Sequence, residues 1–143
     1  MRNHLVFVYG SLKKGFRLNG SLEGQRYVGI ACTEPKYSLF NLGQFPGLID
    51  EQHPEFGHKA PARQIWGELY EVDEDCLIHL DKIEGVENDY YKRKVIYLDQ
   101  ISPVLLPTCP QAFQSLLAKT AFGYIFQLSL QEFSDCGAFW PGF

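Results

Sequence analysis

Apolar residues along the chain fall mostly into short runs, a pattern that favours β-strands. The first run, His4–Tyr9, is nearly all apolar and predicts a central strand covered on both faces. Arg63–Val72 alternates between two faces, with Ile65, Gly67, Leu69 and Glu71 on the same side. Further candidate strands are Gln25–Cys32, Lys36–Leu42, Leu48–Asp50, Tyr91–Leu98 and Ala121–Leu128. Of these, Gln25–Cys32 and Lys36–Leu42 are candidates for a strand pair.

One segment, DEDCLIHLDKIEG, has the periodicity of a helix instead. Asp73 or Asp75 can cap its start, and acidic residues fill its first turn. Gly85 can take the left-handed conformation that ends a helix. The apolar stripe consists of Cys76, Leu77, Leu80 and Ile83, and Ile78 widens it.

The segment Gln100–Lys119 and the C-terminal tail do not follow either pattern. Three prolines in Ile101–Pro110 argue against a central strand there, whereas Gln111–Lys119 is expected to form two helical turns. The tail around Phe139 and Trp140 is unusually aromatic. Because an exposed aromatic tail would be sticky, we expect it to pack back onto the domain.

The order of these elements predicts the fold class. Several strands with one clear helix between them do not form the βαβ alternation of a parallel sheet. We therefore expect an α+β fold, in which a strongly curved or closed sheet packs against the helix. A length of 143 residues suits a single domain covering residues 1–143.

Composition and charge exclude several functions. The hydrophobic content of 45% supplies a core, and the 13 Lys and Arg residues are scattered over a chain with net charge −4, which argues against nucleic-acid binding. No apolar run approaches the ~20 residues of a membrane-spanning helix, and no signal peptide is evident. We therefore expect a cytoplasmic protein with no membrane partner. The four cysteines form no Cys-x-x-Cys unit, which argues against zinc and redox motifs.

The loop after the first strand is the first candidate for chemistry. Gly10 and Gly15 have the spacing of a phosphate-binding loop, but Phe16 and Arg17 stand where that loop requires Lys and then Ser or Thr. Nucleotide binding is therefore a poor interpretation. Successive backbone N–H groups at Gly10, Ser11 and Leu12 can still hold a carboxylate, although the loop can equally be only a tight turn.

The second candidate is the end of the predicted helix. Asp81 and Glu84 lie three residues apart, on neighbouring positions of one face. Glu84 stands at the negative end of the helix dipole, and both this position and partial burial should raise the pKa of its carboxyl group. Such a group suits proton transfer near neutral pH. The simpler alternative is a solvated acid at a helix end.

Together, the two candidates resemble the gamma-glutamylcyclotransferase-like superfamily. The resemblance rests on Tyr9-Gly10-Ser11-Leu12 near the start and Leu80-Asp81-x-x-Glu84-Gly85-Val86 later in the chain. Supporting similarities are Gly15, Asn19, Gly67–Val72, Tyr91-x-Arg93, Val95 and Gly123-Tyr124. The match extends from Val6 to about Phe126, and its ordered spacing makes it more specific than any one motif.

This resemblance implies a small mixed β-barrel with one or two helices. It implies an enzyme that converts a γ-glutamyl amine or amino acid into 5-oxoproline and the free amine. Glu84 would be the catalytic acid/base, and the backbone of Tyr9, Gly10, Ser11 and Leu12 would hold the glutamyl part. No metal or cofactor is implied, and the only partner is the small-molecule substrate.

Several alternatives stay open. A related enzyme could cleave a γ-glutamyl amide on a biosynthetic intermediate. A catalytically inactive module could use the same fold to bind a small carboxylate or a protein. The sequence does not give the leaving amine, the oligomeric state, any part played by Asp81, or the role of Gln100–Lys119, which could be a lid, a packing arm or a dimer contact.

Overall fold

The structure is a computed structural model of the chain. It describes residues 2–10, 12–16, 18–43, 45–131, 133–138 and 140. Ser11 and Phe139 therefore lie outside the described residues, and the side chains of residues 2 and 3 are not described either.

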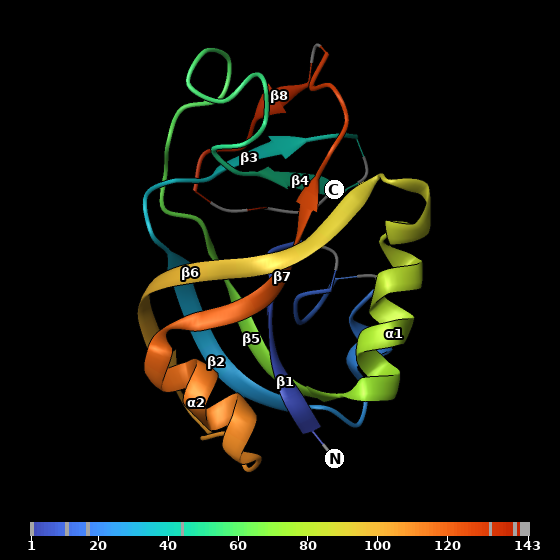
Figure 1. The fold of residues 1–143 in the computed structure, drawn as a ribbon, viewed down its shortest axis with the longest axis vertical. Coiled ribbons are helices and arrows are strands. Elements are labelled where there is room, and N and C mark those ends of the chain that lie inside the picture. Colours follow the sequence, from blue (N-terminus) through green and yellow to red (C-terminus); the bar gives the residue numbers. More distant parts are fainter. Residues whose placement is uncertain are drawn as a thin grey trace.

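Eight strands form one strongly curved sheet (Figure 1). They are β1 (Arg2–Val8), β2 (Arg26–Thr33), β3 (Ser38–Asn41), β4 (Pro46–Ile49), β5 (Trp66–Asp73), β6 (Tyr91–Pro103), β7 (Thr120–Phe126) and β8 (Ser134–Asp135). The strand order is β1-β5-β2-β6-β7-β4-β3-β8, and β1 also pairs with β7. The pairing of β1 with β7 closes a ring of five strands, namely β1, β5, β2, β6 and β7. Strands β4, β3 and β8 extend the sheet beyond β7.

The first strand has the central place that its apolar run predicts. β1 pairs antiparallel with β5 on one side and parallel with β7 on the other. Leu5, Val6, Phe7 and Val8 are all buried, so both faces of the strand are covered. Leu5 and Phe7 belong to one apolar cluster, and Val6 and Val8 belong to a second cluster on the opposite face.

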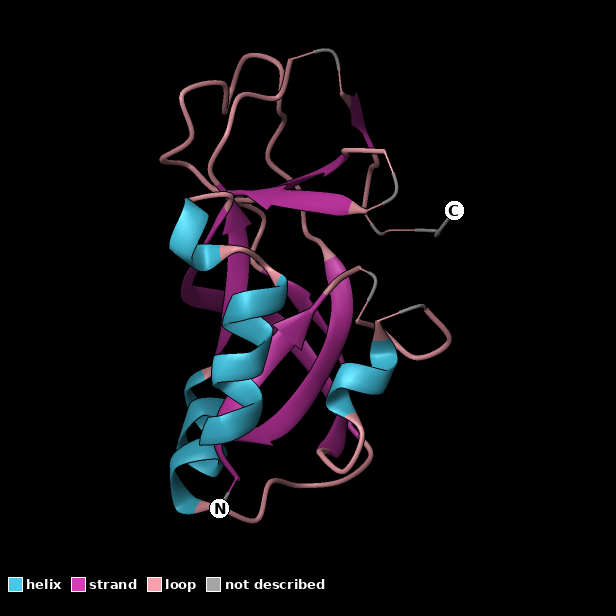
Figure 2. Cartoon of the chain, turned by 90° about the vertical axis from the view of Figure 1, so that its right-hand side faces the viewer, coloured by secondary structure: helices cyan, strands magenta, loops and turns pink. Residues whose placement is uncertain are grey.

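Two α-helices pack against the sheet, on different sides in Figure 1 and with α1 crossing in front of the strands in Figure 2. Helix α1 (Glu74–Ile83) begins at Asp73, whose Oδ1 accepts a hydrogen bond from the Cys76 amide at 2.8 Å. Helix α2 (Pro110–Ala118) contacts β1 and β7. Two short 3₁₀ turns, η1 (Asn19–Leu22) and η2 (Val86–Asn88), complete the helical elements of the described chain. None of the helices among the described residues is long and apolar enough to cross a membrane.

These observations confirm the α+β fold class in its curved-sheet form, but three details of the sequence interpretation are wrong. β2 pairs with β5 and β6, and not with β3, which pairs with β4 and β8. Ile78 is exposed and does not widen the buried stripe of α1.

The third error concerns where the strand predicted over Tyr91–Leu98 ends, whereas the expectation that the proline-containing segment is not a central strand is confirmed. β6 continues through Pro103 and pairs with β2 there, since Ile101 lies opposite Ala31 and Pro103 opposite Gly29. β7 pairs with β6 only as far as Tyr97. The proline-containing end of β6 therefore has a neighbour on one side only, where a missing N–H group does no harm. The rest of the segment packs as an arm against β1 through α2.

The described part of the C-terminal tail packs back onto the domain, as expected. Trp140 is only 1% exposed and belongs to the same apolar cluster as Leu5 and Phe7. Its carbonyl accepts a hydrogen bond from Lys13 Nζ at 3.0 Å, and the carbonyl of Ala138 accepts one from the Trp66 amide at 2.8 Å.

Candidate active site

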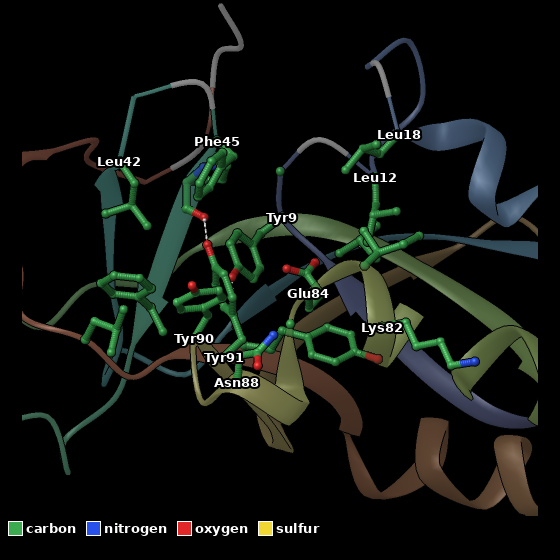
Figure 3. Close-up of a pocket in the computed structure, with 18 of the residues that line it drawn as sticks. Tyr9, Leu12, Leu18, Leu42, Phe45, Lys82, Glu84, Asn88, Tyr90 and Tyr91 are labelled. Carbon is green, nitrogen blue, oxygen red and sulfur yellow. Dashed lines mark hydrogen bonds between the residues drawn. The ribbon is translucent and has the colours of Figure 1, made fainter. Parts of the chain in front are cut away.

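A pocket of about 590 Å³ opens between the loop after β1 and the C-terminal end of α1. Its walls also include the turn between β3 and β4, the start of β6 and the segment after β7. Figure 3 shows the pocket with Glu84 between Tyr9 and Leu12. The structure thus brings the two candidates of the sequence, the loop and the helix end, into one cavity.

The loop after β1 forms one wall. Tyr9, Gly10 and Leu12 all line the pocket, whereas Ser11 lies outside the described residues. Gly10 is required by a close approach, because a Cβ atom at this position would lie 2.4 Å from Cγ of Pro46 in β4. The glycine therefore lets the loop rest directly on the strand that forms the opposite wall.

The carbonyl groups of this loop have partners within the protein. The Gly10 carbonyl accepts from the Lys13 amide at 3.0 Å, and the Leu12 carbonyl accepts from Asn19 Nδ2 at 2.8 Å. Within the described part of the chain, the amides of Gly10 and Leu12 have no hydrogen-bond acceptor. Unpaired N–H groups beside a pocket can bind an anionic group such as a carboxylate.

The end of α1 places Glu84 in the pocket. The Glu84 amide donates to the Leu80 carbonyl at 3.0 Å, so this residue completes the last helical turn. Gly85 follows with φ 69° and ψ 38°, the left-handed conformation that reverses the chain. A side chain there would also meet the ring of Tyr90 at 2.8 Å. Helix α1 therefore ends at Ile83 with Glu84 as its C-cap residue, and the Glu84 side chain is turned into the cavity (Figure 3).

Burial controls the protonation of the Glu84 carboxyl group. It raises the pKa of this group from 4.5 to about 7, because the ionised form loses hydration on burial. None of the described residues donates a hydrogen bond to it. The direction of this shift agrees with the expectation from the sequence. A carboxyl group of this kind is divided between its acid and base forms near neutral pH.

Three tyrosine hydroxyl groups near Glu84 are already engaged elsewhere. Tyr9 Oη donates to the Tyr124 carbonyl at 2.7 Å, and Tyr91 Oη donates to the Pro46 carbonyl at 2.8 Å. Tyr124 Oη donates to Asp81 Oδ1 at 2.6 Å. Burial raises the pKa of all three phenols, and the charge of Glu84 contributes to each shift. These phenols therefore stay neutral and shape the cavity without neutralising the carboxylate.

Sequence reasoning left the roles of Asp81 and Tyr124 unassigned. Asp81 accepts from Tyr124 and also pairs with Arg93, with Nη1 of Arg93 3.1 Å from Oδ2 of Asp81. The network ties the last turn of α1 to β6 and β7, so Asp81 holds the helix that carries Glu84. Asp81, Tyr124 and Arg93 all stand in the motifs quoted above, but nothing in the sequence shows that they meet.

The described side chains of the pocket are suited to proton transfer and not to nucleophilic attack. The described lining residues include no serine, threonine, cysteine or histidine. Elsewhere among the described residues, no three His, Cys, Asp or Glu side chains form a group that could hold a metal ion. The cavity combines one carboxyl group whose pKa burial raises to about 7 with two loop amides that have no acceptor among the described residues.

Comparisons with known proteins agree with this geometry. Residues 6–129 match the family described as gamma-glutamyl cyclotransferase, AIG2-like. A Vibrio cholerae protein named "Putative gamma-glutamylcyclotransferase" is 39% identical over 87 residues, which cover 61% of this chain and 67% of that protein. Gamma-glutamylaminecyclotransferase B of Danio rerio is 38% identical over 102 residues, which cover 66% of this chain but only 49% of that enzyme.

Solved structures share the fold. A crystal structure of an AIG2-like protein from Mus musculus superimposes with a TM-score of 0.61 at 21% identity, covering 88% of this chain and 77% of that one. The family and the names of these relatives indicate an enzyme with gamma-glutamylcyclotransferase activity. Since the family match spans most of its residues, this chain belongs to the gamma-glutamyl cyclotransferase, AIG2-like family.

Proposed function

We propose that this protein converts a γ-glutamyl amine or γ-glutamyl amino acid into 5-oxoproline and the free amine, with Glu84 as general acid and base. The observation that carries the proposal is the carboxyl group of Glu84, which has a pKa of about 7 and faces a pocket wall with unpaired amides. The family membership supports the same reaction.

The chemistry needs no nucleophile from the protein. The substrate's α-amine attacks its own γ-carbonyl carbon, a C–N bond forms, and the five-membered ring closes. The bond from this carbon to the leaving nitrogen then breaks. The α-ammonium nitrogen loses two protons as it becomes the ring N–H, and the leaving nitrogen gains two as it departs as an ammonium ion, so the reaction is balanced without water. Glu84 takes up the first proton as a carboxylate and returns it as an acid.

Ring closure also needs the glutamyl chain to be folded. The amides of Gly10 and Leu12, which have no acceptor among the described residues, can bind the α-carboxylate and hold the α-amine near Glu84, which lines the same pocket. Tyr9 and Ser11 would complete this backbone site, with the buried Tyr9 ring fixing the start of the loop through its hydrogen bond to Tyr124.

The test is formation of 5-oxoproline, measured by mass spectrometry with a panel of γ-glutamyl amines and amino acids. Glu84→Gln should abolish turnover, because the amide keeps the shape of the side chain but does not carry the proton. Glu87→Gln is the matched control, since Glu87 is an exposed acid just beyond the pocket. Equal turnover by Glu84→Gln and the wild type would overturn the role of Glu84.

The loop can be tested separately with the reaction product. Adding 5-oxoproline to ¹⁵N-labelled protein should shift the amide resonances of Gly10 and Leu12 more than those of α2. Binding of γ-glutamyl compounds without any 5-oxoproline formation would favour the inactive carboxylate-binding module instead.

A further inference from the structure

The part of the pocket away from the loop of residues 9–12 is almost entirely apolar. We call it the apolar end and define it by Leu42, Phe45, Tyr90, Phe126, Leu128 and Phe133. In Figure 3, Leu42, Phe45 and Tyr90 lie on the opposite side of Glu84 from Leu12 and Leu18. A substrate that fills the whole cavity would therefore extend past Glu84 into this end.

Contacts along the chain hold these side chains together. A Cβ atom at Gly47 would lie 2.8 Å from Leu42 and 3.1 Å from Phe126, so these two flank the same point of β4. Phe133 directly precedes Ser134, which pairs with Asn41, the neighbour of Leu42. The Gln127 amide donates to the Tyr90 carbonyl at 3.0 Å, which places Leu128 beside Tyr90.

The described residues of the apolar end carry no charged side chain. The described lining residues of the pocket carry two charged side chains, Glu84 and Lys82. The amine of Lys82 points away from the apolar end in Figure 3. No described residue of this end could pair with an ammonium or a carboxylate of a bound molecule.

The apolar end is also open to solvent. Phe45 is 41% exposed, Leu128 43% and Tyr90 51%. A group of large apolar side chains at the rim of a pocket is typical of a surface that an apolar ligand covers. Covering it would remove apolar area from water, which favours binding.

We propose that the amine released by this enzyme carries an uncharged aliphatic or aromatic group, which lies against the apolar end during the reaction. The inference rests on the proposed function and adds the class of leaving group to it. Glu84 then stands at the junction, between the glutamyl part on the loop side and the leaving nitrogen.

A cationic leaving group fits this surface poorly. An amine with a second, distant ammonium would bring that charge against described side chains that offer no acidic partner, and the hydration that these apolar side chains displace from the ammonium is costly to lose. The rings of Phe45 and Tyr90 provide the one feature that could attract it, through cation–π contact. Measurement with matched substrates separates these two effects.

The decisive pair of substrates is γ-glutamyl-n-butylamine and γ-glutamylputrescine, which share a four-carbon chain and differ in one terminal ammonium. We expect kcat/KM for the butylamine compound to be at least about tenfold higher. γ-Glutamylbenzylamine should be used at least as well as the butylamine compound. Equal or preferred use of γ-glutamylputrescine would overturn the inference and leave the proposed function intact.

A variant tests whether the apolar end itself causes the preference. Phe45→Glu adds a carboxylate at this end and should reduce or reverse the preference for the butylamine compound. Leu117→Glu is the matched control, because Leu117 is exposed on α2, outside the pocket, and it should leave the preference unchanged. An unchanged preference in Phe45→Glu would also contradict the inference. Absence of 5-oxoproline from every substrate would instead overturn the proposed function and the inference with it.

Discussion

Two glutamates on consecutive elements show how opposite surroundings give the same side chain different roles. Glu71 in β5 is completely buried, and its carboxylate accepts hydrogen bonds from the Thr108 amide, the Thr108 hydroxyl and the Cys109 amide. Arg26 Nε lies 3.9 Å from it. Glu84 at the end of α1 is only partly buried, yet none of the described residues donates to its carboxyl group.

The difference lies in what replaces water. Around Glu71, fixed donors compensate for lost hydration, so the carboxylate fastens the start of α2 to the sheet. Around Glu84, hydration is lost and no described residue supplies a donor in its place, so the pKa rises to about 7. Burial alone therefore does not identify a reactive carboxyl group, whereas burial without donors does.

The largest expected effect is on the reaction. Glu84→Gln should lower kcat by about 10²–10⁴-fold, the usual contribution of general acid–base catalysis. Glu71→Gln should leave kcat within about threefold of the wild type, because Glu71 does not line the pocket. Steady-state formation of 5-oxoproline by the two folded variants checks both values. Equal losses in the two variants would remove the distinction between the glutamates.

The second effect is on stability, and here the larger loss is expected from changing Glu71. Glu71→Gln should lower the free energy of unfolding by about 2–4 kcal/mol, because the amide leaves buried donors of Thr108 and Cys109 unsatisfied. Urea unfolding at pH 7 measures this loss. Glu51→Gln, at an exposed acid, serves as the control and should change stability by less than about 0.5 kcal/mol. A similarly small change for Glu71→Gln would show that its hydrogen bonds contribute little.

The third effect links Glu84 to pH. Its pKa is higher in the folded state, at about 7, than the ordinary value of 4.5, so the folded protein binds this proton more tightly. The resulting stabilisation is complete below the unfolded-state pKa and is lost as the pH rises through 7. Glu84→Gln does not titrate, so at pH 8 it should be more stable than the wild type by about 1–3 kcal/mol.

Unfolding curves of the wild type and Glu84→Gln at pH 5 and pH 8 check this third effect. The free energy of unfolding of Glu84→Gln should exceed that of the wild type by a growing amount as the pH rises. A difference that stays constant with pH would mean that Glu84 is hydrated or compensated in the folded state.

The smallest effect concerns the support of α1. Tyr124→Phe removes the hydroxyl group that donates to Asp81 and should destabilise the protein by about 1 kcal/mol. It should lower kcat less than tenfold, because the pairing of Asp81 with Arg93 remains. Tyr97→Phe is the matched control on an exposed tyrosine of β6. A loss of kcat as large as that of Glu84→Gln would make Tyr124 part of the catalytic group.

The sequence predicted the parts of the site that depend on local structure. Helix α1 ends just before Glu84 because Gly85 takes the left-handed conformation, and this ending places Glu84 in the cavity. β1 ends in a glycine loop that the apolar run already indicates. Both features follow from a few neighbouring residues.

The rest depends on strand pairing, which periodicity does not specify. Phe45 and Leu42 reach the pocket only because β4 pairs in parallel with β7, with Leu48 opposite Ile125. The donors to Glu71 come from a segment 37 residues away. The expected pairing of β2 with β3 is wrong for the same reason, since β2 pairs with β5 on one side and with β6 on the other.

The central claim is that Glu84 is an uncompensated carboxyl group that exchanges a proton near neutral pH. A ¹³C NMR titration of glutamate side-chain carboxyl groups tests it directly, with Glu84→Gln identifying the resonance. The account predicts that the Glu84 carboxyl group titrates with a pKa of about 7. A pKa near the ordinary value of 4.5 would contradict the claim.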